Sequence, residues 1–71
     1  MNKARLEYEM KIKGISSSEM CKFLKMSRSA FYRKCNMKSE FTRKEIEEII
    51  DILGIDKAEA MMEIFFDEKV S

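Results

Sequence analysis

Residues 15–35 read ISSSEMCKFLKMSRSAFYRKC, and this stretch decides the fold. Ser16 and Glu19 have the spacing of a capping box, in which the serine hydroxyl accepts from a helical N–H and the glutamate carboxylate accepts from the serine N–H. Ile15 and Met20 flank this box as a hydrophobic staple. The sequence therefore predicts that a helix begins directly after Ser16.

Ser27 is the next capping residue, and it predicts where that helix stops and another begins. Met26 before it and Phe31 four positions after it repeat the staple. We therefore expect one helix over residues 17–24 and a second over 28–35, joined by a tight turn. Two helices of about two turns with this connection have the dimensions of a helix-turn-helix motif.

The apolar residues predict which sides of the two helices face each other. Met20, Phe23 and Leu24 share one side of the first helix at three- and four-residue spacing, and Phe31 shares a side of the second with Cys35. These sides should form the interior of the motif.

The opposite side of the second helix carries hydrogen-bond donors. When Phe31 points inward, Ser29 and Arg33 point away from the core and Tyr32 lies beside them, with Arg28 at the leading end. Guanidinium groups suit guanine edges and phosphates, so this side is a candidate nucleic-acid surface.

The run SSEMCKFLKMSRSAFYRK resembles the helix-turn-helix of the phage repressor and Cro class, the Xre-like regulators. The resemblance extends over about residues 6–66, since KGIS before the motif and ILGI after it are also family traits. Two positions depart from the pattern. Lys25 replaces the usual turn glycine and must adopt its conformation at a cost of about 1 kcal/mol. Lys34 replaces an inward aliphatic residue, and we expect Cys35 or Met37 to fill that space.

The resemblance implies a sequence-specific transcriptional regulator of phage or mobile-element type that binds double-stranded DNA. Its helix 28–35 would enter the major groove. The candidate base-reading residues are Arg28, Ser29, Tyr32 and Arg33. The candidate phosphate contacts are Ser17, Ser27, Lys38 and Arg43. For Lys38 and Arg43 the alternative is an ordinary solvated side chain.

Composition agrees with a small helical protein. The 71 residues contain no proline and two glycines, which predicts one all-α domain over 1–71, a bundle of about five short helices containing the motif at 16–35. With no apolar run near 18 residues and no leader pattern, we expect a cytoplasmic chain without a membrane partner.

Charge is divided along the chain. The net charge is only +1, but residues 1–44 contain twelve Lys/Arg and four Asp/Glu, whereas residues 45–71 contain two and nine. The basic half also contains the motif. Such a distribution favours a basic face for DNA, although an accidental division of a solvated surface is the alternative.

The remaining helices follow from periodicity and caps. For residues 3–13 we expect a helix that buries Leu6 and Met10, with Tyr8 or Ile12 widening the stripe. Thr42 and Glu45 form a second capping box, and the helix that follows should end at Gly54. Its inward residues should be Ile46, Ile49, Ile50 and Leu53.

Residues 56–66 predict a last helix, capped by Asp56. One side should carry Ala58, Met61, Met62 and Phe65, with Ile64 and Phe66 outside it. This apolar arc is wider than one core-facing side requires. We therefore expect a homodimer that uses Met62, Phe65 and Phe66.

Other function classes have less support. Without histidine or a glycine-rich phosphate loop, we expect no enzyme, cofactor, metal site or small-molecule substrate. Cys21 and Cys35 should be packing residues, because they are isolated and lie on or near inward faces. The alternative function is an antitoxin-like or antirepressor-like protein-interaction module that keeps the fold without binding DNA.

Overall fold

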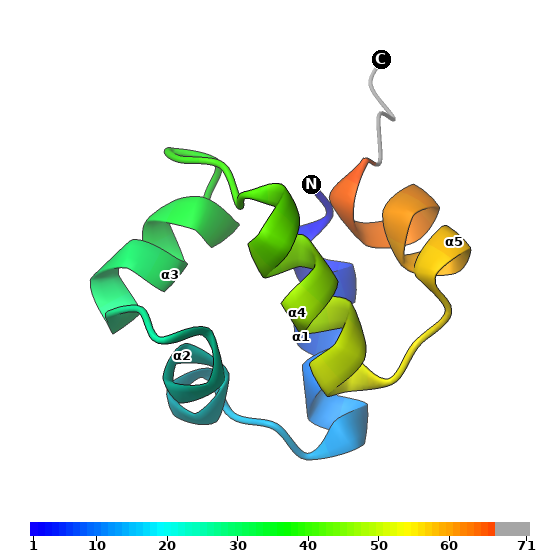
Figure 1. The fold of residues 1–71 in the computed structure, drawn as a ribbon, viewed down its shortest axis with the longest axis horizontal. Helices are drawn as coiled ribbons and strands as arrows, with labels where there is room; N and C mark the ends of the chain where they lie inside the picture. Colours follow the sequence, from blue (N-terminus) through cyan, green and yellow to red (C-terminus); the bar gives the residue numbers. More distant parts are fainter. Residues whose placement is uncertain (67–71) are drawn as a thin grey trace.

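The computed structural model describes residues 1–66, and these residues form helices joined by short turns, with no strand among them (Figure 1). The predicted all-α fold is confirmed. The elements are α1 (Lys3–Lys13), α2 (Ser17–Leu24), α3 (Arg28–Cys35), α4 (Arg43–Leu53), α5 (Lys57–Ala60) and η1 (Met61–Phe65), a π-helical continuation of α5.

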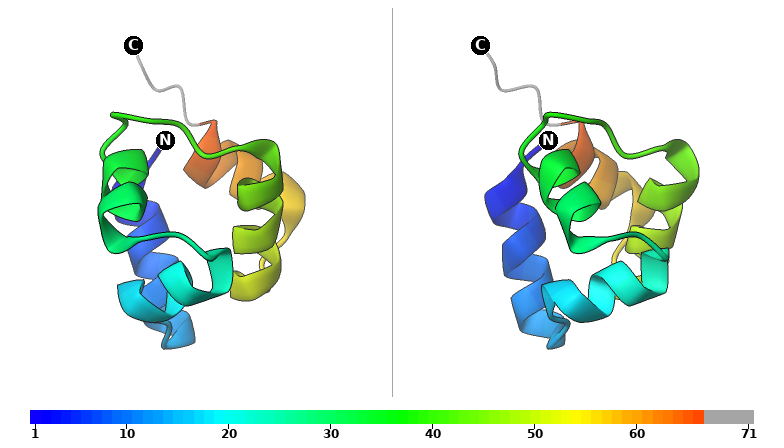
Figure 2. Two further views of the ribbon diagram at one scale, coloured as in Figure 1. Left: turned by 60° about the vertical axis from the view of Figure 1, so that its left-hand side comes forward. Right: turned by 90° about the vertical axis from the view of Figure 1, so that its left-hand side faces the viewer.

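The helix-turn-helix forms one side of the molecule, and α5 with η1 lies at the other end of its longest axis (Figure 1). The right-hand view of Figure 2 looks onto α2 and α3. α2 packs on both α3 and α4, while α1 packs on α4 and η1. The start of the chain is tied to η1 by a hydrogen bond of 2.6 Å from the Asn2 N–H to the Ile64 carbonyl.

The predicted caps determine the helix boundaries. Ser16 and Thr42 each form a complete capping box, with Glu19 and Glu45 respectively. The Ser27 hydroxyl accepts from the Ala30 N–H at 3.1 Å. α2 and α3 therefore have the bounds that the capping residues predicted.

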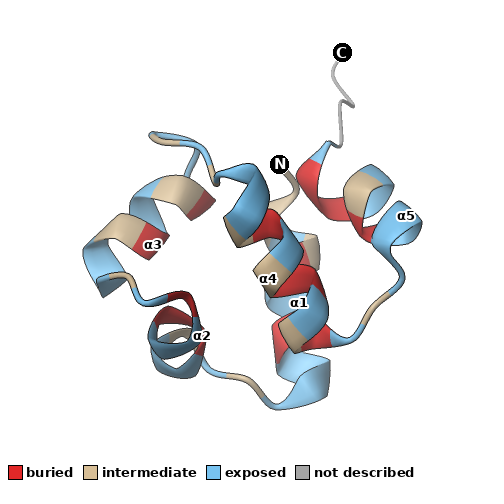
Figure 3. Cartoon of the chain, in the orientation of Figure 1, coloured by how far each residue is buried: buried red, intermediate tan, exposed pale blue. Residues whose placement is uncertain are grey.

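One hydrophobic core joins all the helices, and its residues, red in Figure 3, lie where the helices face one another. On α4 the four predicted inward residues are all buried. The complete buried apolar set is Leu6, Met10, Met20, Cys21, Leu24, Phe31, Cys35, Ile46, Ile49, Ile50, Leu53, Ala60, Ile64 and Phe65.

The predicted inward stripe of α1 is half right. Leu6 and Met10 are buried, but Tyr8 and Ile12 are 57% and 55% exposed. Glu9 takes the third buried position, because it lies one turn from Leu6 on α1, which packs on η1. Its carboxylate is neutralised there by Arg5 at 3.1 Å.

Arg5 links α1 to α5 and η1. Besides Glu9 it contacts Glu59 on α5 at 3.2 Å and Glu63 on η1 at 3.4 Å. The hydrogen bond with Glu9 raises the pKa of the Arg5 guanidinium, and the other two carboxylates act in the same direction. An arginine with three carboxylate partners fixes α5 and η1 against α1.

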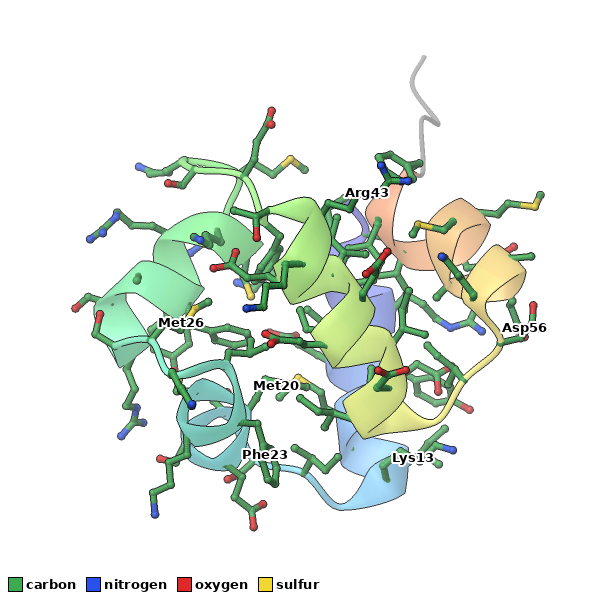
Figure 4. The ribbon with its side chains drawn as sticks, in the orientation of Figure 1. Lys13, Met20, Phe23, Met26, Arg43 and Asp56 are labelled. Carbon is green, nitrogen blue, oxygen red and sulfur yellow. The ribbon has the colours of Figure 1, made fainter. Side chains whose placement is uncertain are left out.

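The prediction that Phe23 points inward is wrong. Phe23 is 57% exposed, whereas Cys21 is buried with Met20 and Leu24. Figure 4 shows Met20 among the side chains at the centre and Phe23 toward the edge. The buried arc of α2 is rotated toward Cys21 because α3 packs on that side, where the Cys21 thiol lies 4.0 Å from the Ser27 carbonyl.

The predicted face of the last helix is right for Phe65 and for the partly buried Met61, but Ala58 is exposed. Ala60, Ile64 and Phe65 are buried, and Met62 is 70% exposed. The reason is the π-helical turn, in which the Phe66 N–H donates to a carbonyl five residues earlier at 2.8 Å. This pairing places residues five apart on one side, so Phe65 joins Ala60 in the core. Phe65 is therefore unavailable as a dimerisation residue.

Candidate nucleic-acid interface

The four residues predicted to read bases form one exposed stripe on α3. Arg28 and Tyr32 are one turn apart, as are Ser29 and Arg33, and all four are exposed. Phe31 and Cys35, on the opposite side, are buried. The structure therefore brings the four side chains together on the outer side of α3.

Contacts on its inner side fix the position of α3. The Phe31 ring meets the Phe41 ring edge-on, with centroids 6.0 Å apart, and Phe41 meets Phe65 at 6.3 Å. The Lys3 ammonium donates to the Asn36 side-chain oxygen at 2.9 Å, just past the end of the helix. A rigidly packed helix presents its outward side chains in a defined geometry, which base reading requires.

Lys34 occupies its unusual position by forming an ion pair. Its ammonium lies 2.7 Å from Glu45 Oε1 and 5.9 Å from the centre of the Phe41 ring. Of the two residues expected to replace the missing aliphatic side chain, Cys35 is buried and Met37 is 61% exposed. Met37 points away because it adopts a left-handed conformation in the turn after α3.

The Glu45 carboxylate is shared between α3 and α4. Partial burial alone would raise the pKa of this carboxyl, but hydrogen bonds from Lys34 and from the Thr42 N–H outweigh the burial. The pKa of Glu45 is therefore lowered. One carboxylate thus caps α4 and connects that cap to α3.

Non-glycine residues in the left-handed conformation stand on both sides of α3. Lys25 has φ 56° and Met37 has φ 62°. At each position the chain closes a helix with paired N–H to carbonyl bonds, from Lys25 and Met26 after α2 and from Met37 and Lys38 after α3. Lys25 thus takes the conformation predicted for it.

The candidate phosphate contacts lie in different settings, and they do not all border the exposed stripe of α3. Lys38 is exposed in the loop before α4, Ser17 is half-buried, and Ser27 uses its hydroxyl oxygen to cap α3. Arg43, labelled in Figure 4, is exposed in the first turn of α4, with its Nε 3.9 Å from Glu47. That long, exposed ion pair leaves the guanidinium open to exchange for a phosphate.

The structure adds two cations that the sequence analysis did not assign to the interface. Lys22 and Lys25 line an open hollow with Arg28, where α2 ends and α3 begins. Their spacing of three residues was visible in the sequence, but the change of chain direction at the turn was needed to place them around one concavity.

The two cysteines are free and buried, as predicted for packing residues. Burial raises the pKa of the Cys35 thiol to about 11, so few thiolates exist at neutral pH. Among residues 1–66, no group of three or more potential metal-ligating side chains occurs. In the same part of the chain, no helix has the length and apolarity needed to cross a membrane.

Comparison with known proteins agrees with this geometry. A family profile described as the Cro/C1-type HTH DNA-binding domain matches residues 5–62, which run from within α1 through α5 and include the whole motif. No curated protein and no solved structure matches the chain significantly. The profile covers most of the sequence, and the chain belongs to the Cro/C1-type helix-turn-helix family of DNA-binding regulatory domains.

Proposed function

We propose that this protein is a sequence-specific transcriptional regulator of phage or mobile-element type, which inserts α3 into the major groove of double-stranded DNA. The observation that carries the proposal is the exposed donor stripe of Arg28, Ser29, Tyr32 and Arg33 on a helix whose inner side is packed. Guanidinium forks can bind the O6 and N7 acceptors of guanine, and the hydroxyls can bind several bases.

Contacts to the DNA backbone would set the register of α3 in the groove. Ser17 lies at the N-terminus of α2, where backbone N–H groups favour an anion. Ser27 lies at the corresponding end of α3, and Lys38 and Arg43 follow the other end of α3 in the sequence. Phosphate contacts on both sides of a reading helix position it without specifying sequence.

A homodimer would extend recognition to two half-sites. Met62 and Phe66 are 70% and 62% exposed at the η1 end of the molecule. Phe66 also lines a pocket of about 370 Å³ with Met1 and Phe41, and Lys34 and Glu40 contribute polar groups to the same pocket. Since α3 lies toward the opposite end of the longest axis (Figure 1), a two-fold contact through η1 would leave both reading helices uncovered.

The test is selection of binding sites from a random duplex pool at near-physiological salt. Enrichment of one motif by the unaltered protein, lost in Arg33→Ala, supports the proposal. Lys13→Ala is the matched control, since Lys13 is an exposed cation at the far end of α1 (Figure 4). If no motif is enriched and Arg28→Ala, Tyr32→Ala and Arg33→Ala all leave duplex binding unchanged, the antitoxin-like or antirepressor-like interaction module replaces this proposal.

A further inference from the structure

An open hollow of about 550 Å³ lies where α2 ends and α3 begins, and we call it the turn hollow. It has two serine hydroxyls, three cations and no carboxylate among its lining residues. These residues are Ser18, Cys21, Lys22, Lys25, Met26, Ser27 and Arg28. Much of the lining surface is apolar, and its three cations, with no carboxylate beside them, attract anions.

The three cations of the turn hollow have no ion-pair partner within the described part of the chain. Some other cations do have partners: Arg5 contacts three carboxylates, and Lys34 contacts Glu45. Lys22, Lys25 and Arg28 are instead all exposed and unpaired among residues 1–66. Three neighbouring like charges repel one another, and a bound anion would relieve that repulsion.

The backbone at Lys25 adds an independent observation. Lys25 has φ 56° and ψ 45°, a conformation that glycine adopts without steric cost and lysine does not. Strain of this kind is concentrated at functional sites. Met37 is also left-handed, so the conformation alone does not indicate a role. What distinguishes Lys25 is that its strained position adds a charge to a hollow already lined by Lys22 and Arg28.

The position of the turn hollow indicates which anion it binds. Arg28 belongs both to the hollow and to the exposed stripe of α3. In helix-turn-helix complexes the first helix of the motif crosses the DNA backbone while the second enters the groove. An anion in the hollow would therefore lie at the groove edge, where the backbone phosphates run. Ser27 can contribute as well, because its oxygen accepts from Ala30 while its O–H remains available to donate.

We propose that the turn hollow binds one phosphate of the DNA backbone, with Lys22 and Lys25 as its principal ligands. This inference rests on the proposed function and extends it to two residues that face no base. Phosphate binding would account for the strained conformation of Lys25. The lysine ammonium neutralises a phosphate, and a glycine at this position has no side chain to do so.

The decisive variant is Lys25→Gly, because a role of Lys25 in the turn alone and a role in phosphate binding predict different DNA affinities. If the position matters only for the turn, glycine relieves the strain and DNA affinity stays the same. If Lys25 binds phosphate, the variant should melt at the same or a higher temperature and yet bind DNA more weakly. Lys25→Arg, which keeps the charge, should retain affinity, and Lys22→Ala should weaken binding as Lys25→Gly does.

The measurement is the dissociation constant on a preferred and on an unrelated duplex over a salt series, with thermal melting of each variant. Lys25→Gly should reduce the slope of log affinity against log salt by about one. Its loss of affinity should be equal on both duplexes and shrink about threefold between roughly 50 and 200 mM salt. Lys13→Ala removes one exposed charge that lies away from the turn hollow (Figure 4), and it should leave the slope unchanged.

Failure of this inference can be separated from failure of the proposed function. If Lys22→Ala and Lys25→Gly leave the slope unchanged while Arg33→Ala still weakens binding to the preferred duplex, the turn hollow binds no phosphate and the DNA-binding proposal stands. The same unchanged salt slope is expected if the turn hollow binds an acidic protein surface and not DNA. If the unaltered chain binds neither duplex at about 50 mM salt, the proposed function fails first.

Discussion

The Lys34 ammonium donates to Glu45 Oε1 at 2.7 Å, and this contact connects α3 to the N-terminal cap of α4. The same oxygen accepts from the Thr42 N–H at 2.9 Å. Both side chains are mostly buried, with 17% and 20% of their surface exposed. A lysine in an inward position is therefore compatible with the fold, because a carboxylate partner receives its charge where an aliphatic residue would otherwise pack.

The first prediction concerns the strength of this contact. Lys34→Ala should destabilise the fold by about 1 to 2 kcal/mol, because Glu45 loses a charged partner in a partly buried site. A double-mutant cycle with Glu45→Gln, measured by urea denaturation, should give a coupling of about 1 kcal/mol. The control cycle uses Arg43 and Glu47, which are 3.9 Å apart with side chains 89% and 48% exposed. Equal couplings in the two cycles would contradict the prediction.

The second prediction is a pH dependence of stability. The pKa of Glu45 is lowered from 4.5 in the folded chain. Its ionised form therefore stabilises the fold fully above about pH 4.5, and this contribution is lost as pH falls through the folded-state pKa. The stability difference between the unaltered protein and Glu45→Gln should shrink between pH 6 and pH 3. A difference that grows on acidification would show that the sign is wrong, and Glu40→Gln controls for net charge.

The third prediction separates base reading from positioning. Arg33→Ala should cost about 1 to 3 kcal/mol on the preferred site and flatten discrimination at one base position, as expected for a lost bidentate contact to guanine. Lys38→Ala should instead weaken binding equally on all duplexes and reduce the salt slope by about one. Competition binding with single-base variants of the site distinguishes the two. Uniform loss in Arg33→Ala would make Arg33 a phosphate contact.

The fourth prediction concerns assembly. Replacing Met62 and Phe66 with glutamate should give a folded monomer that binds DNA more weakly, because both side chains are exposed and neither belongs to the core. Ile12→Glu is the control, since Ile12 is similarly exposed and lies near the C-terminal end of α1. Sedimentation at tens of micromolar, about where weak dimers form, checks the state. If the unaltered protein is monomeric there, the dimer proposal is wrong.

The fifth prediction concerns the cysteines. Cys35→Ser should destabilise the fold by about 1 to 2 kcal/mol without abolishing DNA binding, because a hydroxyl replaces a buried thiol. Cys21→Ser should cost less, since the Ser27 carbonyl lies 4.0 Å from its sulfur and can accept a hydrogen bond. With its pKa raised to about 11, the Cys35 thiol should react with iodoacetamide only as fast as the chain opens. An intramolecular disulfide in the native protein would contradict this assignment.

The helix boundaries could be read from the sequence because each depends on a few neighbouring residues. Ser16, Ser27 and Thr42 each accept from an N–H three residues ahead. These bonds are local, so their spacing in the sequence is also their spacing in space. The outward position of Arg33 followed in the same way, because Phe31, two residues earlier, has to face the core.

What only the tertiary structure decided is which part of each helix its neighbours cover. Phe23 is exposed and Cys21 buried because α3 packs on the thiol side of α2. Ile64 lies in the core with Phe65, although a period of 3.6 residues placed Ile64 outside that side, because the chain adopts a π-helical turn at its contact with α1. The partner of Lys34 is eleven residues away on another helix. Such contacts depend on how the helices pack in three dimensions, and no local spacing in the sequence specifies that arrangement.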